Sequence, residues 1–212
     1  MYRLLPALIA TLTFGAPAAG QAYEQLPRQL ASLTPADFAR SARISDDPLK
    51  AAVVLSTEKG YTRTRLIQGA RADDVHLRAV VDRSTGRVTW QVWHQLIDVS
   101  AHLDVVAVTY VDGGALRQVR PIAQEHALAL CPPTDGPGMC SKVTRVGFEL
   151  PDGAVREIAA GYRPNSRTPW RLRFKGASGR DVTGGLAPAE AAGLINAVEA
   201  WRGHAAQPRR ID

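Results

Sequence analysis

The chain of 212 residues carries a formal net charge of +6 at pH 7, and 45% of its residues are hydrophobic. Its length suits one globular domain with a substantial core, and it contains no internal repeat, low-complexity tract or linker long enough to separate two domains. The mild excess of Arg and Lys suits acidic partners such as lipid headgroups, polysaccharide or an acidic protein. It is equally the composition of an ordinary solvated surface.

Residues 1–22 have the pattern of a secretory signal peptide. Arg3 precedes an apolar run from Leu4 to Phe14, and small residues follow as far as Ala22. The apolar run is shorter than the roughly 20 residues that a membrane-spanning helix needs. No Cys stands near the junction to carry a lipid. We therefore expect a periplasmic or secreted mature protein without a transmembrane anchor.

Residues 23–50 are predicted to form an N-terminal helical segment. Thr34 is an N-cap candidate, and Pro35 occupies the first helical position. A short helix should run to about Arg43. We expect Asp46-Asp47-Pro48 to end it, because the residue before a proline is pushed out of the helical region.

Residues 51–203 are predicted to form a single β-rich domain organised around a hairpin from Val75 to Ile97. Apolar and polar residues alternate on both sides of a polar turn that ends in Gly86. Gly86 can take the left-handed conformation that such a turn needs, and Asp82 can accept hydrogen bonds from its backbone. The alternation places His94 on the same face as the apolar residues.

Further strands are predicted on either side of this hairpin, at 51–57, 61–68, 103–111, 115–121, 125–131, 140–150, 170–175 and 180–183. Pairing of 125–131 with 140–150, with Cys131 opposite Cys140, sets His126 against Arg145 and Leu128 against Val143. Apolar residues change parity along 140–150, which predicts a bulge near Thr144 or Arg145.

Cys131 and Cys140 bracket a loop rich in Pro and Gly. In an exported chain such a pair is most simply a disulfide. A metal site would need two more ligands at motif spacing, and a redox site would need Cys-x-x-Cys. Neither pattern occurs.

An amphipathic helix is predicted from Pro188 to Trp201, with Glu190 favouring its start and Gly203 ending it. Residues 204–212 should form a flexible tail. The predicted fold class is therefore α+β. It has a mostly antiparallel sheet, of which a sandwich is one form, packed by the C-terminal helix.

Two groups of residues are candidates for binding a partner. Trp93 lies on the opposite face of its strand from Trp90, where it either contacts a partner or is covered by a second layer such as the N-terminal helix. Arg171, Arg173 and Lys175 share one side of a strand. This basic stripe either meets an acidic group or is the charged outer face of an edge strand.

Histidines and carboxylates that could serve a metal or a general base cluster in sequence: His94, Asp98, His102 and Asp104, with His126 as a further contributor. Their spacing fits no known ligand pattern. No Gly-x-Ser-x-Gly, phosphate loop or dinucleotide fingerprint occurs, and Ser56 and Lys59 lack the companion motifs of a Ser-x-x-Lys enzyme. We assign no catalytic residue, metal or cofactor.

The segment Asp82-Arg83-Ser84-Thr85-Gly86-Arg87-Val88-Thr89-Trp90-Gln91-Val92-Trp93 resembles a recurrent segment of exported proteins and lipoproteins of proteobacteria with no known activity. In those proteins a Cys-bracketed turn and a C-terminal helix also follow. This chain differs from the lipoprotein members in lacking the anchoring Cys. The resemblance implies the hairpin, disulfide and helix, and it implies no reaction.

These observations favour a non-catalytic periplasmic binding or accessory protein that recognises an envelope protein or an anionic envelope component. An inhibitor or immunity protein belongs to the same class. The alternative is a periplasmic hydrolase or metal-dependent enzyme using His94, His102 and Asp98 or Asp104. Nucleic acid is not expected as a partner, because the protein is exported and the basic stripe has no interleaved aromatics.

Overall fold

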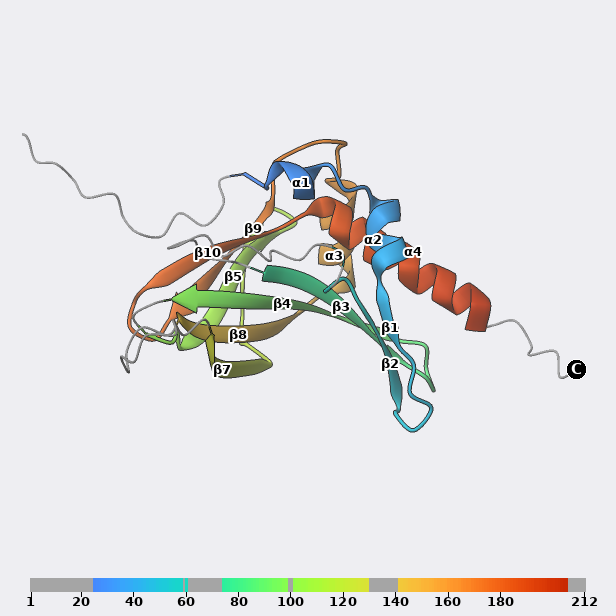
Figure 1. The fold of residues 1–212 in the computed structure, drawn as a ribbon, viewed down its shortest axis with the longest axis horizontal. Coiled ribbons are helices and arrows are strands. Elements are labelled where there is room, and N and C mark those ends of the chain that lie inside the picture. Colours follow the sequence, from blue (N-terminus) through green and yellow to red (C-terminus); the bar gives the residue numbers. More distant parts are fainter. Residues whose placement is uncertain (1–24, 59, 61–73, 99–100, 130–140, 206–212) are drawn as a thin grey trace, which may run out of the picture.

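The structure, a computed structural model, describes residues 25–58, 60, 74–98, 101–129 and 141–205 (Figure 1). The signal peptide, the strand at 61–68 and the disulfide between Cys131 and Cys140 lie outside the described residues, so these three stay predictions.

The described strands form two antiparallel sheets, which confirms the predicted α+β class. The first has six strands in the order β1-β2-β3-β4-β8-β7, and the second has four in the order β10-β9-β5-β6. Their bounds are β1 Arg43–Ser45, β2 Ala52–Ser56, β3 Asp74–Asp82, β4 Val88–Asp98, β5 Val105–Asp112, β6 Ala115–Val119, β7 Ala123–Ala129, β8 Ser141–Leu150, β9 Trp170–Gly176 and β10 Asp181–Leu186.

The predicted central hairpin is confirmed as β3 and β4, which pair without interruption. Gly86 has a φ of 69°, the left-handed conformation that the turn requires. The Asp82 carboxylate accepts hydrogen bonds from the backbone N–H groups of Ser84 and Thr85 at 2.9 and 2.8 Å. Hydrogen bonds from the Ser84 hydroxyl and from Thr85 lower the pKa of Asp82 to about 2.

The two sheets pack against each other through their inner faces. Phe148 of β8 stacks on Tyr110 of β5 and meets Phe174 of β9 edge-on, with ring centroids 6.4 and 6.3 Å apart. These rings belong to one core that includes Leu77 and Val92 of the central hairpin. Because the inner faces are buried together, the outer faces of the two sheets point away from each other.

Four helices occur in the described residues: α1 Arg28–Ala31, α2 Pro35–Ser41, α3 Asp152–Ala160 and α4 Pro188–Ala205. They gather on one side of the strands (Figure 1). The main sheet contacts of α3 and α4 are with β2, β3 and β4, and α2 packs on α4. The C-terminal helix therefore packs against the sheet, as predicted.

The helix ends differ from the prediction. Thr34 and Asp37 form a capping box at the start of α2, but α2 ends at Ser41 because the chain turns into β1, which pairs with β2. At the other end of the chain, α4 continues through Gly203 to Ala205. A glycine weakens a helix by about 1 kcal/mol relative to alanine but does not by itself end it.

The predicted register of β7 and β8 is wrong by one residue. His126 pairs with Thr144 and Leu128 with Lys142, and both ladders of β8 run without a bulge. No change of face is needed, because Thr144 itself fills a core-facing position, where its hydroxyl accepts a 3.1 Å hydrogen bond from the Leu103 N–H. Val143 is buried on the other face of the strand.

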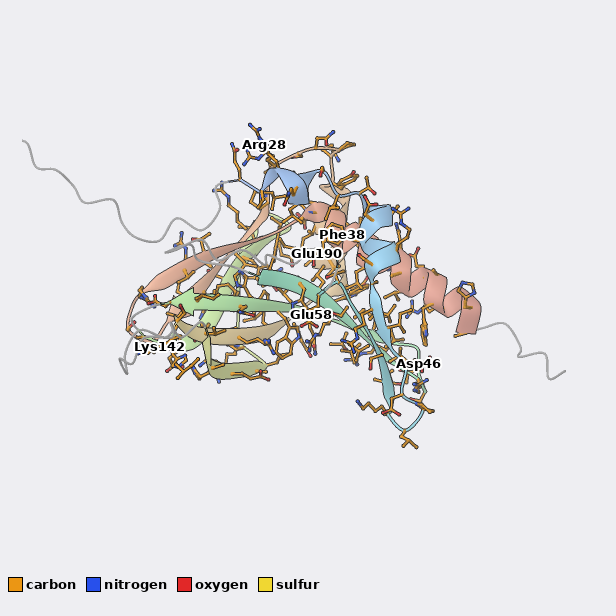
Figure 2. All side chains as sticks on the ribbon, viewed as in Figure 1. Arg28, Phe38, Asp46, Glu58, Lys142 and Glu190 are labelled. Atoms are coloured by element: carbon orange, nitrogen blue, oxygen red, sulfur yellow. The ribbon has the colours of Figure 1, made fainter. Side chains whose placement is uncertain are left out.

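Glu190, in the first turn of α4, is only 3% exposed. Its carboxylate accepts hydrogen bonds from the Thr57 hydroxyl and, at 3.3 Å, from the Leu77 N–H. Figure 2 labels it just below the start of α4, beside Phe38 of α2. The sequence predicted only that Glu190 favours the helix start, whereas its buried carboxylate also joins α4 to the central hairpin.

We expect Gly193→Ala to destabilise the fold by about 1–3 kcal/mol, because overpacking forces neighbouring groups apart. A Cβ at Gly193 would lie 2.4 Å from the Phe38 Cβ and 2.7 Å from the Pro35 carbonyl oxygen. Gly203→Ala is the matched control. Nothing lies within 4 Å of its Cβ position, so alanine should stabilise α4 by about 0.5 kcal/mol. Urea unfolding measures both, and equal effects at the two positions would contradict the packing.

Candidate functional site

The structure separates the two predicted groups of binding residues. Trp93 lies on the outer face of the six-stranded sheet, opposite His76 on β3. Arg171, Arg173 and Lys175 lie on the outer face of the four-stranded sheet. Because these faces point away from each other, one small ligand cannot contact both groups.

Trp93 offers a partner little surface, since it is 9% exposed. Its ring lies over Gly147, where a Cβ would come within 2.9 Å of it, and the Arg78 guanidinium carbon lies 4.5 Å from the ring centroid. The indole N–H donates to Gln91 Oε1 at 3.1 Å. Trp93 is therefore covered by neighbours in its own sheet, and the N-terminal helix proposed as its cover packs on α4 instead.

His76, opposite Trp93, is 6% exposed. Burial lowers the pKa of His76 to about 4, and the positive charges of Arg78 and Arg145 act in the same direction while Glu58 opposes them. The imidazole is therefore neutral at neutral pH and adds no charge to this face.

The basic stripe lies on an interior strand, so the interpretation as an edge strand is wrong. β9 pairs with β10 on one side and β5 on the other. Leu172 and Phe174 of β9 are buried in the core, while Arg171 and Arg173 are exposed. Lys175 forms an ion pair with Asp181 at 2.8 Å.

Two exposed apolar residues, which the sequence interpretation missed, share this face with the basic stripe. Val111 and Leu116 pair directly across β5 and β6 and are 53% and 75% exposed. The signal was present in the sequence: the two-residue turn Gly113-Gly114 sets Val111 against Leu116. The outer face of the four-stranded sheet thus combines exposed guanidinium groups with exposed apolar side chains, and we call it the basic face.

The histidine and carboxylate candidates are brought together only in part. His94 is buried in the core, with its ring edge-on to Phe174 at 4.9 Å between centroids. Asp98 forms an ion pair with Arg180 at 2.7 Å. The buried His94 side chain therefore does not face an open site.

His102 and His126 do meet, with ring centroids 4.7 Å apart. Gln124 links them to Asp104, because its amide nitrogen lies 3.3 Å from His126 Nε2 and donates to Asp104 Oδ1 at 2.9 Å. Within the described part of the chain, no three His, Cys, Asp or Glu side chains converge as a metal site.

A hollow of about 210 Å³ lies between β4, α3 and α4. Asp152 at its rim accepts hydrogen bonds from the Trp90 indole N–H at 2.8 Å and from Arg156 at 2.7 Å. Arg202 donates to the Gly86 carbonyl oxygen. Two acidic and two basic residues, Asp152, Glu199, Arg156 and Arg202, line the hollow, so it does not select a ligand of either charge.

We found no family model, no curated protein and no solved structure that matches this chain. Among the helices of the described residues, none combines the length and apolar character needed to cross a membrane.

Replacing His76 with Gln should reduce the loss of stability in acid. The folded-state pKa of His76, about 4, lies below its ordinary value of 6.5, so the unfolded chain binds this proton more readily. The stabilising contribution is therefore complete above pH 6.5 and is lost as the pH falls through 4. At 1.36 kcal/mol for each pKa unit, it amounts to about 3 kcal/mol. Urea unfolding of both proteins across this range measures the difference, and identical pH dependence would contradict it.

Proposed function

We propose that this chain is a non-catalytic, exported binding or accessory protein that holds an acidic partner protein on its basic face. The observation that carries the proposal is the composition of that face. Arg171 and Arg173 are exposed beside the exposed pair Val111 and Leu116. The described helices make their main contacts with each other and with the six-stranded sheet, and leave this face open.

Protein is the partner class that this composition favours. Guanidinium groups bind carboxylates in a bidentate geometry, and Arg is enriched among the residues that contribute most to protein interfaces. Anionic lipid is less suited, because each basic residue contributes only about 1 kcal/mol at a membrane surface. Lys175 is already paired with Asp181, which leaves few charges for that purpose. An envelope enzyme that this protein inhibits would satisfy the same chemistry.

The hydrolase or metal-enzyme alternative rests on His102 and His126, since His94 and Asp98 have other surroundings. It makes a distinct prediction. The purified protein would hold near-stoichiometric zinc or copper, and His102→Ala would release the metal. The binding proposal expects neither result.

Reversing Arg171 and Arg173 to Glu should weaken binding of poly-glutamate, used as an acidic polypeptide probe, by about tenfold at low salt. The affinity of the unaltered protein should also fall as salt rises to physiological strength, because exposed charges are screened over about 8 Å.

The matched control reverses Arg28 in α1 and Arg87 in the β3–β4 turn, which are also exposed. Both double variants change the net charge equally. Isothermal titration measures each affinity. Equal losses in the two variants would show that net charge alone attracts the probe, and would overturn the basic face as the site.

A further inference from the structure

β6 is an open edge of the four-stranded sheet. It pairs with β5 on one side, and Ala115, Leu116, Arg117 and Gln118 are all exposed. The opposite edge, β10, is different, because Gly184 and Leu186 are buried and a Cβ at Gly184 would lie 2.8 Å from His94 Nε2. β6 is the more exposed of these two edges, and a strand can add to it without rearrangement of the core.

The turn before β6 fixes which backbone groups face outward. Gly113 and Gly114 have φ values of 57° and 78°, which defines a type I′ hairpin turn closed by the pair Asp112 and Ala115. In such a hairpin the closing pair exchanges hydrogen bonds, and hydrogen-bonded and non-hydrogen-bonded pairs then alternate. The N–H and C=O groups of Arg117 therefore point toward β5, and those of Leu116 and Gln118 point away from the sheet.

β6 has few of the features that usually prevent another strand from pairing with a sheet edge. Proteins block edges with proline, bulges or charges. β6 contains no proline, and its pairing with β5 runs without a register shift. Its one charge is the exposed Arg117, whose guanidinium lies 3.6 Å from the carboxylate of the partly buried Asp112. Arg120 follows directly after the strand.

We propose that an extended, acidic segment of the partner protein adds to β6 as a fifth antiparallel strand. Leu116 and Gln118 would exchange backbone hydrogen bonds with it, an apolar residue would pack on Leu116, and a carboxylate would lie opposite Arg117. Opposite charges across a strand pair stabilise it, and like charges destabilise it. The inference rests on the proposed function, because the rest of the partner then reaches Arg171 and Arg173 across the basic face.

A second copy of this chain fits the edge less well. An antiparallel pair of β6 strands related by a two-fold axis at Arg117 sets the two Arg117 side chains opposite each other. Like charges at such a position are unfavourable. The same charge complements an acidic strand, and this difference decides between the two occupants.

The test uses the full chain and short synthetic peptides in which Glu and Val alternate. Gln118→Pro removes an outward N–H without breaking the β5 ladder, and should weaken binding about tenfold, as expected for lost backbone hydrogen bonds. Gln118→Ala keeps the N–H and should bind like the unaltered protein. Arg117→Glu should shift the preference toward a peptide of alternating Lys and Val.

Each outcome decides the proposal. Weaker binding by Gln118→Pro alone, together with the charge switch at Arg117→Glu, supports strand addition. Equal binding by Gln118→Pro and Gln118→Ala overturns it, and if Gln118→Pro fails to fold, an absent charge switch at Arg117→Glu overturns it. Dimerisation that Gln118→Pro abolishes would assign the edge to a second copy instead. The Arg171 and Arg173 variant could lose poly-glutamate binding while the β6 variants bind normally. That result would support the basic face as the binding site and contradict strand addition at β6.

Discussion

The buried carboxylate of Glu190 determines where the helical layer lies. A polar or charged group removed from water is costly unless hydrogen bonds compensate it. The Thr57 hydroxyl, just after β2, and the Leu77 N–H of the central hairpin both donate hydrogen bonds to this carboxylate. Gly193, three residues further along α4, then lets α2 approach closely. The helices are thereby fixed beside β2 and β3, and the outer face of the other sheet is left open.

Sequence periodicity was sufficient to locate three hairpins, although β1 was not predicted. Alternation and turn chemistry located the β3–β4 hairpin, the β5–β6 hairpin at Gly113-Gly114 and the hairpin of β9 and β10. The register of β7 and β8 was predicted wrongly, because the prediction assumed that Cys131 lies directly opposite Cys140. The Thr144 hydroxyl also accepts a hydrogen bond inside the core. A pattern of apolar residues cannot reveal that a polar residue occupies a core position.

The candidate site was only half predictable, because sheet order depends on contacts between distant segments. The alternation of side chains along each strand showed that Trp93 and the basic stripe lie on the opposite face from the apolar residues of their strands. It could not show that they belong to two different sheets with opposite outer faces. Nor could it show that β9 is interior and β6 is at the edge. The same limit hid the burial of Trp93, which depends on Gly147 lying opposite it in β8.

Hydrogen exchange of the backbone amides in β6 tests the central claim most directly, namely that the open edge of the basic face is where a partner binds. In the free protein, the Leu116 and Gln118 amides should exchange faster than that of Arg117, which faces β5. Addition of the peptide of alternating Glu and Val should slow Leu116 and Gln118 and leave β4 unchanged. Slowed exchange around Trp93, or unchanged exchange in β6 under saturating peptide, would contradict the account.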